Sequence, residues 1–390
     1  NIATGSNIII DTTAPTITSI TSSTANGSYK AGSAISVTIN FSEPITLVAT
    51  MGINLDSGGV AIVNAFSGMT ATGIYTVGVG QTSFDLTATS ITINDTARDA
   101  ALNNLILTIP GTNIATGSNI IIDTTAPTIT SITSSTANGS YKAGSIISVT
   151  INFSELITLT GTMGINLDSG GLVAINAFTG TTATGIYTVL AGQTSADLTA
   201  TSVLVNSTCR DVALNNLVTT LPATNIATGS NIIIDTTAPT IISITSSTAN
   251  GSYKAGSVIS VRINFSEIIT IVGTMAINLD TGGVVVINSF TGTTTTGTYT
   301  VLAGHTSADL TAISVVVNTT ARDNALNDMV VTLPLTNIAT GSNIIIDTTA
   351  PIITSITSPT ANGFYTIGAN ISVRVNFSEM ITLAGTMGVN

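Results

Sequence analysis

Charged residues are scarce in this sequence. Asp, Glu, Lys and Arg together make up only 7% of the 390 residues, against about 25% in a typical soluble domain. The 19 acidic residues outnumber the 8 basic ones, which gives a formal net charge of −11. Because so few cations are available to attract phosphate groups, we expect binding neither to nucleic acid nor to anionic lipid.

Cysteine, histidine and tryptophan are almost missing as well. The chain has one cysteine, Cys209, one histidine, His305, and no tryptophan. A single cysteine cannot form an internal disulfide, so core packing or bound ions must hold the fold together. No Ser/His/Asp or Cys/His set can be assembled in any part of the chain, which predicts that the protein is not an enzyme. Aromatic residues make up only 4% of the chain. This disfavours carbohydrate binding, because sugar-binding surfaces need exposed aromatic rings.

Long apolar runs are absent although 43% of the residues are hydrophobic. The longest runs, such as Ile8 to Ile10, have the length of a strand, far below the roughly 20 residues that a membrane-spanning helix needs. We therefore expect no membrane insertion of this segment. What fills the sequence instead is Thr, Val, Ile, Ser, Asn and Gly, a composition typical of β-structure.

The sequence repeats itself. The segment NIATGSNIIIDTTAP begins at Asn1, Asn113, Asn225 and Asn337, and each copy starts 112 residues after the one before. This period is too long for a solenoid coil or a propeller blade and has the size of one small domain. The predicted division is the last strand of a preceding repeat at 1–12, Ig-like repeats at 13–124, 125–236 and 237–348, and an incomplete repeat at 349–390.

Within one repeat, short apolar segments alternate with turns. In the second repeat, Ile147 to Phe153 alternates apolar and polar residues, which predicts a strand with one buried face. Further strands are expected in the same repeat at 128–133, 163–167, 172–178, 185–190, 198–205 and 231–234. About seven strands in 112 residues predict an all-β fold of tandem immunoglobulin-like β-sandwiches, arranged like beads on a string.

Three motifs suggest a family. They are DTTAPTITSITSSTANGSYKAGSIISVTINFSELITLTG, then AGQTSADL, then RDVALNNL. With its DTTAP start, YKxG turn and FSE corner, the whole chain resembles the bacterial Ig-like repeats of large surface adhesins and biofilm proteins. It departs from that pattern in its shorter middle strands and in having Ala or Val before the Leu-Asn, where the family commonly shows Gly-Asn after the Asp. The resemblance implies an extracellular stalk on the cell surface that does no chemistry itself and is often stiffened by calcium at its junctions.

Three acidic residues of each repeat should meet at one pole of a sandwich, because the loops that carry them lie at the end where the first strand begins. Calcium takes 6–8 oxygen ligands, and Asn103, Asn215 and Asn327 could add to the carboxylates. The predicted interdomain calcium ligands are Asp11, Glu43 and Asp99, then Asp123, Glu155 and Asp211, then Asp235, Glu267 and Asp323.

Two alternatives compete with calcium at these carboxylates. Arg98, Arg210 and Arg322 are adjacent to the loop aspartates and could neutralise the acids as ion pairs. The carboxylates could also be simply solvated. Elsewhere, we interpret Asp56 and its equivalents as turn residues, and His305, which replaces Gln81 and Gln193, as a surface residue.

Two functions of different classes follow. The first is a structural extender, or stalk, of a long extracellular adhesin or fibre, whose partners are the neighbouring repeats. The second is a self-assembling extracellular filament or sheath subunit, in which strand edges of one chain bind other copies of the same chain. Low charge favours the second, since soluble proteins usually guard such edges with lysine, proline or bulges.

Overall fold

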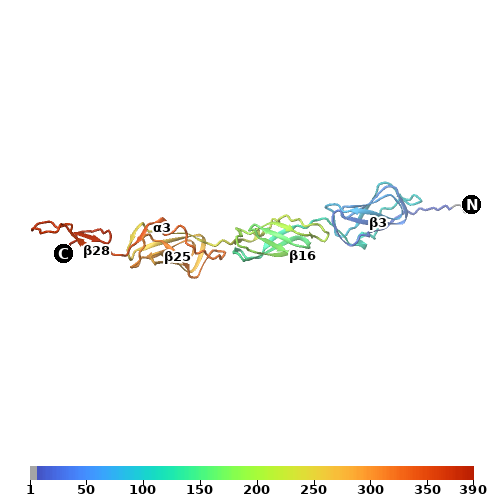
Figure 1. The fold of residues 1–390 in the computed structure, drawn as a ribbon. Helices are drawn as coiled ribbons and strands as arrows, with labels where there is room; N and C mark the ends of the chain where they lie inside the picture. The colour runs from blue at the N-terminus through green and yellow to red at the C-terminus, as the bar shows by residue number, and fades with distance from the viewer. Residues whose placement is uncertain (1–6) are drawn as a thin grey trace. The chain divides into compact units, whose positions relative to one another are not determined.

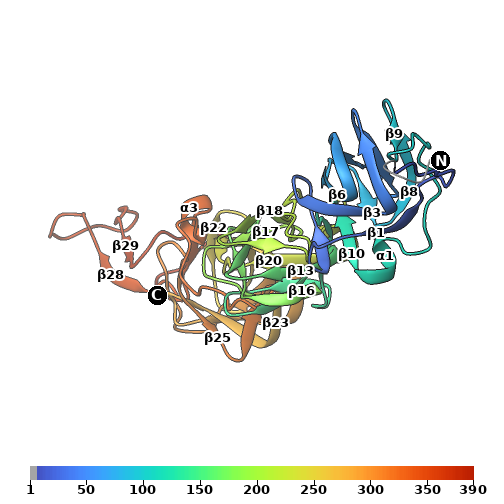
Figure 2. The same ribbon diagram turned by 90° about the vertical axis from the view of Figure 1, so that its right-hand side faces the viewer.

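The computed structural model describes residues 7–390 and is all-β, which confirms the predicted class. The helices in this range are single turns, α1 (Ile114–Gly117), α2 (Ile226–Gly229) and α3 (Ile338–Gly341). The chain separates into two compact units, one ending at Asp235 and the other beginning at Thr236. Both units are built from similar curled antiparallel sheets (Figures 1 and 2).

The first unit contains two successive sets of strands that correspond position by position across the 112-residue period. The first set is β1 (Ile17–Thr21), β2 (Gly27–Tyr29), β3 (Ala34–Leu47), β4 (Met51–Leu55), β5 (Val60–Val63), β6 (Phe66–Thr76), β7 (Thr82–Ser83), β8 (Ala88–Ile93), β9 (Ala97–Arg98) and β10 (Ile120–Asp123). The second set is β11 (Ile129–Ser134), β12 (Gly139–Tyr141), β13 (Ile146–Leu159), β14 (Met163–Leu167), β15 (Leu172–Ile175), β16 (Phe178–Thr188), β17 (Thr194–Ser195), β18 (Ala200–Val205), β19 (Cys209–Arg210) and β20 (Ile232–Asp235).

Each set forms one large and one small sheet. In the first set the large sheet has the order β1-β3-β6-β5-β4-β8, and β9 also pairs with β3. The small sheet has the order β2-β10-β7, with β10 parallel to β2 and antiparallel to β7. In Figure 2, β1 and β3 can be followed side by side. The second set repeats this topology with β11 to β20.

The core lies between the two sheets of a set. Along β13, Ile147, Val149 and Ile151 are fully buried and alternate with partly exposed polar residues, as the sequence predicted. Ile232 and Ile234 of the small sheet belong to the same buried cluster. Burying this many branched aliphatic side chains supplies the main stabilising term, at roughly 25 cal/mol per Å² of apolar surface removed from water.

Several boundaries differ from the sequence-based prediction. The strand expected at 163–167 matches β14, but the one expected at 172–178 ends at Ile175, and β16 already begins at Phe178. The short helix α2 lies inside the recurring segment that begins at Asn225, where the sequence analysis predicted no helix. Asn225 caps it by accepting a hydrogen bond from the Ile226 amide, and the same side chain brackets the backbone of Ala200.

The second unit uses the same plan with some strands merged. Its strands are β21 (Ile241–Thr245), β22 (Gly251–Tyr253), β23 (Val258–Leu279), β24 (Val284–Thr300), β25 (Ala312–Val317), β26 (Thr320–Arg322), β27 (Ile344–Ile346), β28 (Ile353–Thr357) and β29 (Arg374–Phe377). Beyond residue 348, β28 and β29 form a two-stranded sheet.

In the described part of the segment 1–12, the structure has no strand, although the sequence predicted one. Residues 1–6 lie outside the described residues, and residues 7–12 form no strand. Ile8, Ile9 and Ile10 are exposed, whereas their equivalents in β10 pair with strands of their own repeat. In β10 the equivalent residues form a strand because β2 and β7 pair with them.

Candidate acidic site

The first member of each acidic set stands where a last strand ends. Asp123 is the final residue of β10 and pairs with Thr82 of β7, so its backbone belongs to the first repeat. Its side chain accepts a hydrogen bond from the Thr125 amide, which starts the turn into the next repeat. Asp11 makes the equivalent bond to the amide of Thr13.

The second member is a glutamate in a bulge. In β13 the pairing with β16 breaks between Asn152 and Ile157, and Glu155 lies in the interruption. Ser154, next to it, exchanges hydrogen bonds with Thr128 through its side chain and its backbone amide. Bulges of this kind re-aim a side chain away from the regular alternation of a strand, and here the glutamate is half-buried at the sheet end. Glu43 occupies the same bulge in β3.

The third member is a buried aspartate held by its own loop. Asp211 follows β19 and is 5% exposed. Its two carboxylate oxygens accept hydrogen bonds from the amide and the side-chain nitrogen of Asn215, both at 2.8 Å. The side chain of Asn215 also donates to the Asp123 carbonyl at 3.0 Å. The predicted asparagine therefore acts as a bracket that joins the loop aspartate to the junction aspartate.

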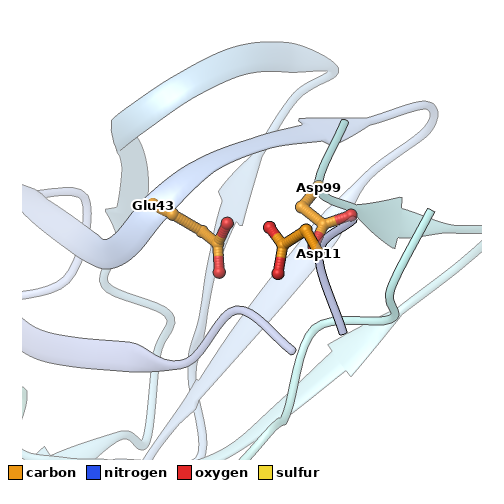
Figure 3. A group of neighbouring side chains, drawn as sticks. All are labelled: Asp11, Glu43 and Asp99. Carbon is orange, nitrogen blue, oxygen red and sulfur yellow. The ribbon is translucent and has the colours of Figure 1, made fainter. Parts of the chain in front are cut away.

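In the first unit the structure brings both predicted sets together. One carboxylate oxygen each of Asp11, Glu43 and Asp99 lies within 4.8 Å of the other two, and the same holds for Asp123, Glu155 and Asp211. Figure 3 shows Asp11 and Glu43 facing each other with Asp99 beside them. In the second unit, Glu267 occupies the matching bulge of β23 and Asp323 follows β26; Asp235 is the last residue of the first unit.

The arginine beside the loop aspartate is not the partner of these acids in the first unit. Arg98 donates through Nε to the Asn104 side chain at 2.8 Å, and Arg210 makes the same bond to Asn216 at 2.7 Å. In the second unit, Arg322 pairs with Asp328 at 2.6 Å. In the first unit both arginines bond the asparagine six positions further on, so the ion-pair alternative has no geometric basis for the two acidic sets there.

The three carboxylates repel one another. Burial, and next the charges of Asp123 and Asp211, raise the pKa of Glu155 above its ordinary value. The pKa of Glu43 is raised in the same way by burial, then by Asp11 and Asp99. For Asp99, burial alone would raise the pKa, but the hydrogen bonds from Asn103 and from the amides of the loop outweigh it and lower the pKa. Mutual repulsion of this kind is what a cation would relieve.

This repulsion predicts a pH dependence in the absence of divalent cations. Because the folded state raises the pKa of Glu155, this group favours folding below its unfolded pKa of about 4.3, and that contribution is lost as pH rises through the folded pKa. Thermal melts in chelator between pH 4 and 7 should show a stability that decreases as the pH rises, and the decrease should be smaller in the Glu155→Gln variant. Parallel curves for the variant and the parent would contradict the repulsion.

Geometrically, these sets could hold a metal ion. Calcium lies 2.3–2.6 Å from its oxygen ligands, so two ligands on opposite sides of one ion are at most about 5 Å apart. The oxygens of each set in the first unit fall within that limit. Three carboxylates supply up to six oxygens, and the hard, anionic oxygen donors suit calcium better than softer metals.

The sequence did not reveal that the aspartate loop is strained. Leu102, Leu214 and Leu326 adopt φ of 70°, 70° and 68°, a left-handed conformation that costs a side-chain-bearing residue about 1–2 kcal/mol. In the same turn, Asn215 donates two hydrogen bonds back to Asp211.

Leu214→Gly is therefore expected to stabilise the second repeat by roughly 0.5–1 kcal/mol, because glycine adopts this conformation without the Cβ clash. Leu214 is exposed, so little burial is lost. Urea denaturation followed by labelling of the buried Cys209 thiol would report on this repeat. Val212→Gly, at an exposed position of the same loop without positive φ, serves as the control and should destabilise instead.

Residues outside the acidic sets have structural roles. Asp56 accepts hydrogen bonds from Ser83 and from the Thr87 amide, consistent with a turn residue. His305 differs from the surface residue we expected: its Nδ1 lies 2.7 Å from the buried Tyr299 hydroxyl, and the two rings stack. Burial raises the pKa of Cys209 to about 11, which keeps its thiol protonated and unreactive.

Comparison with known proteins returned no match to a family model and none to a curated protein. Within residues 7–390, the helices fall short of the length and apolar character that crossing a membrane requires.

Proposed function

We propose that this chain is part of the structural stalk of a long extracellular surface adhesin or fibre, built from tandem Ig-like repeats whose junctions bind calcium. The observation that carries the proposal is that Asp123 belongs to both repeats. Its backbone closes the small sheet of the first repeat, while its carboxylate lies with Glu155 and Asp211 of the second. An ion held by these three residues would couple the two repeats directly.

The local architecture supports a mechanical role. In each set of about 112 residues, a large and a small sheet share one apolar core, and we infer an immunoglobulin-like sandwich from this arrangement. Hydrogen bonds add to the junction. Lys30 of the first repeat donates to the Leu214 carbonyl of the second, and Thr124, at the end of the first repeat, accepts from the Gly80 amide and donates to the Gln81 carbonyl of its own repeat. These polar contacts are individually weak, so the cation is the element that would stiffen the junction.

Distances measured by electron paramagnetic resonance between two spin labels test whether calcium couples the two repeats. Spin labels at Asn64→Cys and Asn176→Cys, both exposed, report on the first and second repeats, with Cys209→Ala removing the native thiol as in the neighbouring repeats. Calcium should narrow the distance distribution, and chelator should broaden it. Glu155→Gln should leave it broad in both conditions. Identical distributions with and without calcium would remove the calcium-coupled stalk.

The cellular part of the proposal needs its own test. Antibodies raised against the purified chain should label intact cells of the source organism without permeabilisation, because a stalk lies outside the cell. Mild protease treatment of whole cells should abolish this labelling. Signal that appears only after lysis would exclude a surface stalk, whatever the outcome of the calcium measurements.

A further inference from the structure

The large sheet of each repeat ends in a strand with one open edge. β8 and β18 are the last strands in the order of their sheets, and β25 pairs only with β23. Across residues 7–390, no second strand pairs with any of them. In an antiparallel ladder, alternate residues pair on one side, so the remaining ones present their N–H and C=O groups on the open side.

This edge is guarded only at its beginning. The pairing of each strand shifts at its second residue, and the side chain of Asn113, Asn225 or Asn337 bonds the backbone of its first residue. The strands read ATSITI in β8, ATSVLV in β18 and AISVVV in β25, without a charged residue or a proline. The opposite border of the same sheet is covered instead, since Thr128 and Ser131 bridge to Val218 and Thr224. Native proteins normally block an exposed edge with lysine, proline, a bulge or a covering segment. Beyond the first two residues of each strand, the border formed by β8, β18 and β25 carries none of these guards.

The face beside the open edge is apolar and uncharged. In the second repeat, Leu204 is 55% exposed and pairs with Gly164, which in turn pairs with Ala174. Ile186, 62% exposed, continues this row. The second unit presents Val316, Ala276 and Val286 in the same row. Exposed apolar groups in a continuous row mark contact surfaces more often than isolated ones do.

A concavity lies at the end of the same edge in both units. In the first unit it measures about 270 Å³ and is lined by Val205, Cys209 and Leu217 among others. In the second unit the equivalent residues Val317, Ala321 and Met329 line one of about 210 Å³. Its recurrence beside the open edge of both units provides room for side chains of an added strand.

We propose that β8, β18 and β25 form a homotypic pairing edge, along which a second copy of this chain adds its own equivalent strand in antiparallel orientation. The partner is a second copy because an antiparallel pair of identical edges is self-complementary about a two-fold axis. The three edge strands also carry no charged residue, so two chains of net charge −11 repel each other least where these strands meet. The proposal is independent of calcium and of the stalk.

Recurrence of the edge strengthens the contact. Each repeat offers one short pairing strand of six residues, which by itself would bind weakly. When one strand has paired, the next pairs at an effective concentration set by the tether, so several weak contacts together give a stable association. Side-by-side association of chains is the expected result.

Sedimentation velocity of the chain over a wide concentration range tests the proposal. We expect reversible dimers, and we expect the variant Thr92→Lys/Leu204→Lys/Val316→Lys, with one lysine on each edge strand, to dimerise at least about tenfold more weakly because the lysines oppose one another. The control Thr72→Lys/Thr184→Lys/Thr296→Lys adds the same charge at exposed positions in the middle of the same sheets, outside the apolar row, and should dimerise nearly as the parent does.

Amide hydrogen exchange identifies the edge directly. Protection should rise with concentration at the backbone amides of β8, β18 and β25, and not at those of β11. Melting curves of both lysine variants should match the parent, which keeps the comparison free of unfolding. A chain that stays monomeric at every soluble concentration would overturn the proposal. Equal loss of dimer in the edge and control variants would do the same, because it would place the contact on the sheet face.

Discussion

Saturating calcium is expected to raise the stability of the second repeat by about 2.7 kcal/mol when free calcium reaches about 100 times its Kd. For a domain near 100 residues, this corresponds to a rise in melting temperature of roughly 10 °C. The reason is the repulsion among Asp123, Glu155 and Asp211, which the folded state must overcome without a cation. Urea titrations with labelling of Cys209, the single thiol and a buried one, follow this repeat selectively.

Glu155→Gln should act in opposite directions in the two conditions. In chelator it relieves repulsion and stabilises the repeat, whereas in calcium it removes a ligand and lowers the gain from the ion. Asp95→Asn removes the same charge at an exposed position outside the acidic sets and should leave the calcium response unchanged. A midpoint that does not move with calcium in the parent chain would rule out the ion at this junction.

Tyr187→Ala is expected to cost about 3–5 kcal/mol, the range for removing a large aromatic side chain from a core. Tyr187 is 1% exposed, and its ring lies against the backbone of Gly171, where an added Cβ would come within 2.3 Å of Cε2. Truncation would leave a cavity that strands of fixed register cannot close. The Cys209 labelling midpoint in urea should fall accordingly.

Tyr187→Phe separates the packing of the ring from its hydroxyl. The hydroxyl accepts a hydrogen bond from Ser169 at 3.0 Å and donates to Gln193 at 2.7 Å. Phenylalanine keeps the ring and removes both bonds, so a loss of about 1 kcal/mol is expected. If Tyr187→Ala cost no more than Tyr187→Phe, the ring would not be the main packing element that its burial indicates.

Much of the local structure could be predicted from residue patterns. The alternation of Ile147, Val149 and Ile151 with polar residues predicts a strand with one buried face. The period of 112 residues located equivalent positions in each copy. Short strands such as β17 and β19 escaped prediction because two residues carry no periodicity; they exist only through pairing with partners distant in the chain.

The acidic site shows where sequence information ends. Chain order and turn placement were enough to group Asp123, Glu155 and Asp211, since loops at one pole of a sandwich must be neighbours. The choice between a cation site and an ion pair depended on the orientation of one arginine side chain. Arg210 points to Asn216, and a flexible arginine adjacent to Asp211 in sequence has several such options that only packing distinguishes.

By itself, the sequence determined that the chain is all-β, that it repeats, and which carboxylates come together, because these properties follow from composition, period and alternation. Tertiary structure decided the rest. The bulge that directs Glu155 to its neighbours, the hydrogen bond between His305 and Tyr299, and the open edge of β18 all depend on strand pairing. Pairing joins residues that are far apart in the chain, and its register depends on the whole sheet rather than on any one segment.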